Sequence, residues 1–184
     1  QDAFINSAKK RSYDVLVLDT VIDSHFIGVL EQKLEKVNVK RVDADTVDKL
    51  IEKDITLESV LSDEQKEKTK VLFEGLMESK AATVQVEAMP TDELPVVITF
   101  PEFMRRMTDM QAVSGQASMF GNMPMMYTVS VNANHPLTQK ILATEDEAQQ
   151  KELAKQAYDL ALLSQGMLSG KALTTFIQRT VEVL

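Results

Sequence analysis

Apolar and polar positions divide the first fifty or so residues into a small α/β unit. The continuous apolar run that follows Tyr13 and ends at Asp19 predicts a strand covered on both faces. Apolar residues then recur about every four positions over 22–34, which predicts a helix with one apolar stripe. Alternation over 37–42 predicts a second strand, and residues 46–53 a short helix. The helical stripe consists of Ile22, Phe26, Leu30 and Leu34.

The middle of the chain predicts a helix and a sheet. The polar segment 54–59 has little to bury, so a domain boundary is expected there. Ser62 and Gln65 have the spacing of a capping box, and the helix that they begin is expected to reach about Ser79. Short alternating or apolar runs then predict three strands of one mixed or antiparallel sheet. These runs are 84–86, 96–100 and 127–131.

The last forty residues have the strongest helical periodicity and predict a helical hairpin. Thr144 and Glu147 have the spacing of a second capping box, and Gly166 is a natural end for the first helix. That helix is apolar on more than one side, so one hairpin cannot cover it. A second copy would complete a four-helix bundle; the alternative is that the hairpin packs on the chain's own sheet. The predicted dimer interface consists of Leu153, Ala157, Leu160, Ala161, Leu173, Phe176, Ile177 and Val181.

An insertion between the last two predicted strands is rich in methionine. Seven of the ten methionines fall between Met104 and Met126. Residues 102–113 predict an amphipathic helix with Arg105, Arg106 and Asp109 on its polar side. Methionine adapts to many apolar partners, so the insertion predicts an exposed binding patch; the alternative is that its methionines fill the core. The candidate binding residues are Phe103, Met104, Met107, Met110, Val113, Met119 and Phe120.

Composition narrows the class of protein. A net charge of −8 and a pI near 4.8 make nucleic acid an unfavourable partner. No apolar run approaches the roughly 18 residues that a membrane span needs, so no membrane association is expected. The absence of cysteine fits a reducing compartment, and the cytoplasm is the expected location. Because the chain begins at Gln1, we expect a fragment of a longer protein.

Residues that could support catalysis or metal binding are few. Asp19 ends a predicted buried strand, where α/β proteins place functional groups, so a magnesium-dependent phosphotransfer site centred on it is one hypothesis. The alternative is a carboxylate that stabilises the start of the helix. His25 lies on the first helix and His135 precedes Pro136 in a predicted turn, and both are interpreted as structural. No metal site is predicted.

Several stretches, taken together, carry a resemblance to a known family. They are YDVLVLDTVID, which begins at Tyr13, LEQKLEKVNVKRVD, which begins at Leu30, and then LPVVIT, VNANHPLTQKIL and TEDEA…YDLALLSQGML…FIQRTVEVL. These stretches resemble bacterial members of the ninety-kilodalton heat-shock chaperone family. The first two are similar to the strand-to-helix segment late in that family's middle domain, and the others to the sheet and the dimerisation hairpin of its carboxyl-terminal domain. The resemblance covers nearly the whole chain.

The resemblance implies that this chain is part of a longer protein whose domains have different functions. Residues 1–55 would be the last α/β subdomain of the middle domain, and 56–184 the dimerisation domain. The amphipathic element at 102–113 would project into the dimer cleft and contact non-native client proteins. ATP and magnesium would be bound by an amino-terminal domain that is not part of this chain. The full-length parent would be an ATPase, while this part would hold no catalytic residue and no cofactor.

The sequence therefore predicts an α+β protein. It has a small α/β subdomain, then a three-stranded sheet with helices, and a hairpin that forms a dimeric four-helix bundle. The predicted function is homodimerisation and client binding within an ATP-dependent chaperone that assists protein folding. The alternatives are a purely structural dimerisation module and the phosphotransfer enzyme centred on Asp19.

Overall fold

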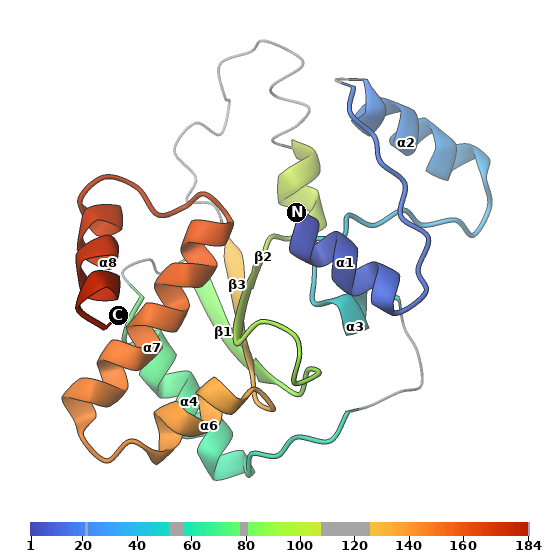
Figure 1. Ribbon diagram of the computed structural model, residues 1–184. Helices are drawn as coiled ribbons and strands as arrows, with labels where there is room; N and C mark the ends of the chain where they lie inside the picture. Colours follow the sequence, from blue (N-terminus) through green and yellow to red (C-terminus); the bar gives the residue numbers. More distant parts are fainter. Residues whose placement is uncertain (21, 52–56, 78–80, 108–125, 184) are drawn as a thin grey trace. The chain divides into compact units, whose positions relative to one another are not determined.

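The computed structural model describes residues 1–20, 22–51, 57–77, 81–107 and 126–183 of an α+β fold (Figure 1). The chain divides into two compact units. The first contains residues 1–53 and 99–127, and the second contains 54–98 and 128–184. The assignment of 1–55 and 56–184 to two domains of a longer chaperone stays a prediction.

The first unit is built from helices α1 (Asp2–Lys10), α2 (Asp23–Lys33) and α3 (Val47–Leu50). Its small core is centred on Ala8 of α1 and Leu50 of α3. Tyr13, Val15, Val42 and Ala44 pack against these two residues. Helix α1 was not predicted, whereas α2 and α3 were.

The two strands predicted in this unit are wrong. Residues 13–19 and 37–41 follow an irregular path, and Val17 is 80% exposed. A continuous apolar run becomes a buried strand only where other strands and helices cover both of its faces. Within the run 13–19, the alternate positions Tyr13 and Val15 pack against the core, and the residues from Leu16 to Asp19 are exposed.

Helix α2 buries a different face from the one that its sequence predicts. Ile27 is its buried residue, while Ile22, just before the helix, and Phe26 are exposed. The predicted stripe, which continues to Leu34, therefore faces mostly outward. At the amino end, the Asp23 carboxylate accepts hydrogen bonds of 2.6 Å from the hydroxyl and the amide of Thr20. These bonds lower the pKa of Asp23.

The second unit is organised around a mixed sheet, as predicted. Its strands β1 (Ala82–Glu87), β2 (Val96–Thr99) and β3 (Tyr127–Asn132) lie in the order β1-β3-β2. The amide of Asn132 donates to the carbonyl of Pro95, so the end of β3 meets the start of β2 and these strands are antiparallel. The amide of Ala133 donates to Glu87, which makes β1 and β3 parallel. The same register brings Phe100 opposite Tyr127, with ring centroids 6.2 Å apart.

Helix α4 (Asp63–Glu74) packs against β1 and begins as the sequence predicts. The Ser62 hydroxyl accepts from the Gln65 amide, and the Gln65 side chain accepts from the Ser62 amide, so the capping box is confirmed. Thr69 and Phe73 are its buried residues. The helix ends at Glu74 with Gly75 as its C-cap, several residues before the predicted end near Ser79.

Two helix starts further along differ from the prediction. Helix α6 (Pro136–Ala143) was not predicted; only a turn at His135 and Pro136 was. Pro136 occupies the first position of the helix, and the Nδ1 atom of His135 accepts from the Leu137 amide. Helix α7 (Glu147–Ser164) is capped by Asp146, whose carboxylate accepts from the Gln149 amide at 2.8 Å. The predicted box of Thr144 and Glu147 is therefore wrong, because Thr144 instead caps the end of α6.

Candidate functional site

The predicted carboxyl-terminal hairpin is present. Helix α7 is followed by α8 (Gly170–Val183), and Gly166 has a φ of 67°, a conformation that glycine adopts at low cost. Gln156 donates to the Thr180 hydroxyl at 2.7 Å, and Arg179 donates to Asp159 at 2.7 Å. The earlier of these α7 positions, Gln156, meets the later α8 position, Thr180, and the two helices run antiparallel, as Figure 1 shows.

The hairpin buries one side and leaves an apolar side open. The buried apolar residues of its two helices are Ala154, Ala157, Tyr158, Ala161 and Phe176. Leu160 is 47% exposed and Ile177 is 52% exposed. Because Gln156 lies opposite Thr180, Leu160 and Ile177 lie at the same level of the hairpin. With Val181, one turn beyond Ile177 and also exposed, they form an uncovered apolar side.

The predicted interface residues therefore separate into three groups. Leu160, Ile177 and Val181 are exposed, and Leu153 and Leu173 are half-buried. The other three, Ala157, Ala161 and Phe176, are already buried within the single chain.

A buried polar cluster fixes α8 on α7. Asp159 is 3% exposed and pairs with Arg179 and with Lys155. Arg179 also donates to the side-chain oxygen of Gln156 at 2.7 Å. A buried carboxylate needs such partners, because an unpaired charge in an apolar setting is costly. The cluster therefore specifies which positions of the two helices meet.

The insertion begins with residues 102–107, which are helical, as predicted. Phe103 is 71% exposed, and Met104 and Met107 are half-buried. The remaining candidate residues lie outside the described part of the chain. They are Met110, Val113, Met119 and Phe120.

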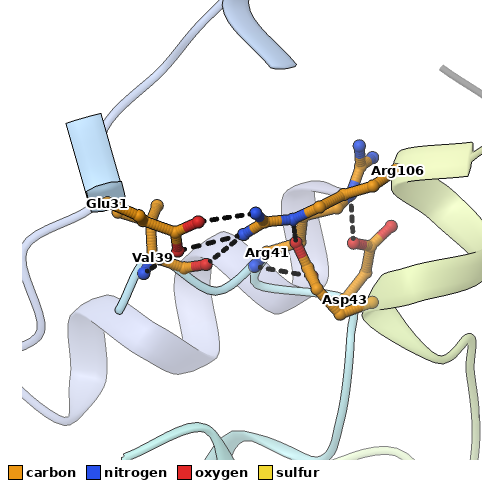
Figure 2. A network of polar contacts seen from close by, with 6 residues as sticks. Glu31, Val39, Arg41, Asp43 and Arg106 are labelled. Carbon is orange, nitrogen blue, oxygen red and sulfur yellow. Dashed lines mark hydrogen bonds and ion pairs between the residues drawn. The ribbon is translucent and has the colours of Figure 1, made fainter. Parts of the chain in front are cut away.

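The polar side of residues 102–107 is bound to the rest of the first unit, of which these residues are a part. Arg106 donates to both oxygens of Glu31, at 2.7 and 3.2 Å, and to the carbonyl of Val39 at 2.7 Å (Figure 2). It also donates to Glu102, one turn back on the same helix, at 2.7 Å. Such charge-assisted, two-pronged hydrogen bonds are among the stronger polar contacts in proteins. The Arg106 contacts lower the pKa of Glu31, with a further contribution from the Val39 amide.

A second arginine contributes beside the first. Arg105 pairs with Asp43, which is 2% exposed, at 3.3 Å, and its guanidinium carbon lies 4.1 Å from the centroid of the Phe100 ring. Arg41 also donates to Asp43, at 3.2 Å. The arginine side of this amphipathic segment thus faces protein, while Phe103 on its apolar side faces outward.

This arrangement was only partly visible in the sequence. The helix at 102–107 was predicted from its periodicity, but its partners Glu31 and Asp43 were not. They lie about 60 to 75 residues earlier in the chain, at distances that no local spacing encodes. The adjacent arginines Arg105 and Arg106 on the polar side of an amphipathic helix were the available signal.

The structure gives no support to a phosphotransfer site at Asp19. The strand that was to present Asp19 is absent, and this aspartate is exposed in an irregular segment. Within the described ranges, no group of three or more histidine, cysteine, aspartate or glutamate side chains could hold a metal ion. His25 is exposed, and His135 caps α6. Among the described helices, none is long and apolar enough to cross a membrane.

Comparison with known proteins places the chain in a family. The family model described as Hsp90 protein matches residues 1–184. The chain is 30% identical to the chaperone protein HtpG of Porphyromonas gingivalis and 29% identical to that of Bacteroides fragilis. The corresponding identity to HtpG of Bacteroides thetaiotaomicron is 26%. Each comparison covers all of this chain and 37% of the relative.

The chain therefore belongs to the Hsp90 family of heat-shock chaperones. It spans little more than a third of the length of the curated relatives that it matches. The resemblance found in the sequence is thereby confirmed.

Proposed function

We propose that this chain is the homodimerising, client-contacting part of a chaperone that assists protein folding. The observation that carries the proposal is the pair of uncovered apolar sides: one on the hairpin, at Leu160, Ile177 and Val181, and one at Phe103. The names of the relatives supply the class of activity. That the parent hydrolyses ATP with magnesium in another domain, and that this chain is non-catalytic, stay predictions.

The hairpin side suits a second copy of itself. Two such hairpins related by a two-fold axis would bury Leu160, Ile177 and Val181 in a four-helix bundle. The half-buried Leu153 and Leu173 would complete the interface. Because Ala157, Ala161 and Phe176 are already buried within one chain, they would pack beneath the interface and not contact the second copy.

The segment at 102–107 suits non-native proteins. An unfolded chain exposes apolar side chains in no fixed arrangement, and an outward phenylalanine beside two methionines can adapt to many of them. Anchoring by Arg105 and Arg106 keeps the apolar side from turning inward. In a dimer, two such patches would act together on one client.

The dimer is tested with Ile177→Asp. The substitution would bury a charge at the centre of the proposed bundle, so the mass measured by light scattering should fall from twice 20.6 kDa to 20.6 kDa. Val71→Asp is the matched control, because Val71 of α4 is also exposed but lies outside the hairpin. An Ile177→Asp chain that remains dimeric would contradict the hairpin interface.

Client contact is tested with Phe103→Asp. The variant should keep the dimer mass and suppress the aggregation of a heat-denatured model protein less effectively, by about fivefold in the concentration required, because a large apolar contact is lost. Val71→Asp again serves as the control. Unchanged suppression would favour the second candidate, a structural dimerisation module, for which the half-buried state of Met104 and Met107 is the supporting observation.

A further inference from the structure

The polar network around Arg106 has a role that dimerisation and client contact do not explain. Arg106 joins three parts of the first unit: the end of α2 at Glu31, the irregular segment at Val39, and its own helix at Glu102. Its side chain and that of Glu31 are both more than two-thirds buried. Charged hydrogen bonds in such a setting are screened less by solvent than those on an open surface.

The same contacts are reinforced through the backbone. The Glu31 carboxylate accepts from the Val39 amide at 2.8 Å, and Glu102 accepts from the Arg41 amide at 3.2 Å. Each carboxylate therefore binds an arginine side chain and a backbone amide at once. Residues 31–41 and 102–107 are consequently joined by hydrogen bonds in which each segment both donates and accepts.

We propose that Arg106 is a positioning residue that latches residues 102–107 onto residues 31–41 and thereby keeps Phe103 turned outward. In this arrangement the ion pairs, and not apolar packing, set the orientation of the segment. Without them, the favourable direction for Phe103, Met104 and Met107 would be toward the protein interior. The latch deepens the proposed client role and rests on it for its significance, although its structural part can be tested separately.

Hydrogen exchange on the full 184-residue chain tests the latch directly. Arg106→Gln and Glu31→Gln should each speed exchange of the amides in 102–107 about tenfold, since each removes hydrogen bonds to a charged group. The double variant should speed exchange by less than the product of the two single effects, because the substitutions share the Arg106–Glu31 contact. In Arg106→Lys, the exchange rate at 102–107 should lie between those of the unchanged chain and Arg106→Gln. Lysine keeps the positive charge but lacks the guanidinium group that binds both oxygens of Glu31.

Two controls separate a latch from general stabilisation. Glu64→Gln breaks the exposed pair with Lys68 on α4 and should leave the exchange of 102–107 unchanged. Amides of α7 should keep their protection in every variant. Unaltered exchange at 102–107 in Arg106→Gln, or an equal acceleration in α7, would overturn the proposal.

A fluorescent probe gives an independent measurement. The chain contains no tryptophan, so Phe103→Trp introduces a single reporter at the segment. We expect iodide to quench this tryptophan less when Arg106→Gln is added, because without the latch the ring turns toward the protein interior. Identical quenching with and without Arg106 would count against the latch.

Aggregation suppression by the same variants distinguishes the latch from the client role. Weaker suppression together with faster exchange at 102–107 supports both. Faster exchange with full suppression supports the latch and contradicts client contact at Phe103. Unchanged exchange contradicts the latch, whatever the suppression.

Discussion

At the scale of single residues, polar side chains decide how the apolar ones are presented. Periodicity correctly gave a helix beginning near Glu102, with arginines on one side and Phe103 on the other. It did not reveal which side faces the protein, because Glu31 and Asp43 come from a distant part of the chain. An amphipathic pattern is usually interpreted with its apolar side inward; here Phe103 is 71% exposed, while Arg105 and Arg106 pair with Asp43 and Glu31.

His135 provides a test of a single cap. Its Nδ1 atom accepts from the Leu137 amide, and burial lowers the pKa of this histidine. As the pH falls through about 6.5, His135 is therefore protonated in the unfolded chain before it is protonated in the folded one. The free energy of unfolding should be highest above this pH and should decline below it. Protonation of Nδ1 removes the cap, which should lower the free energy of unfolding by about 1 kcal/mol.

The measurement is urea unfolding at pH 7.5 and at about pH 5.5. His135→Asn keeps an N-cap acceptor without a titrating ring, so its stability should fall less over the same interval. An equal fall in both proteins would show that other groups are responsible.

At the scale of elements, the regular parts of the second unit were the most predictable. Alternation at Tyr127, Val129 and Val131 gave β3, and the capping box at Ser62 gave the start of α4. The strands expected in the first unit failed, because an apolar run such as that after Tyr13 specifies burial but not the neighbours that provide it. The hairpin was predicted correctly. Which of its residues are buried and which are exposed was not, because this depends on the ion pair between Asp159 and Arg179 that sets how the two helices meet.

The buried cluster of the hairpin predicts a coupled effect on stability. Arg179→Met leaves Asp159 with Lys155 as its remaining ion-pair partner and should lower the free energy of unfolding by about 2 kcal/mol. Asp159→Leu together with Arg179→Met should cost less than the sum of the two single changes, since no buried charge is stranded. Urea titration of the four proteins measures this coupling, and strictly additive losses would contradict it.

At the scale of the whole molecule, the proposed function depends on having two copies of a weak patch. Tethering two modest contacts raises their effective concentration without any new contact. Ile177→Asp should therefore reduce aggregation suppression per chain by about tenfold, although Phe103 is untouched.

This effect is measured by comparing the concentration of Ile177→Asp that is needed for half-suppression with that of the Val71→Asp control. Fusing the monomeric variant to an unrelated dimeric coiled coil should restore much of the loss. Full activity of an Ile177→Asp monomer would mean that one patch suffices.

The pairing of β2 with β3 also bears on how such a protein could diversify. Phe100 and Tyr127 face each other across the two strands, so the chain leaves the sheet and returns to it at neighbouring points. Enlarging a connection between fixed ends costs little, about 0.6 kcal/mol for each doubling of its length. The connection between these two strands can therefore lengthen at little cost in free energy, provided that Arg105 and Arg106 are kept for their partners Asp43 and Glu31.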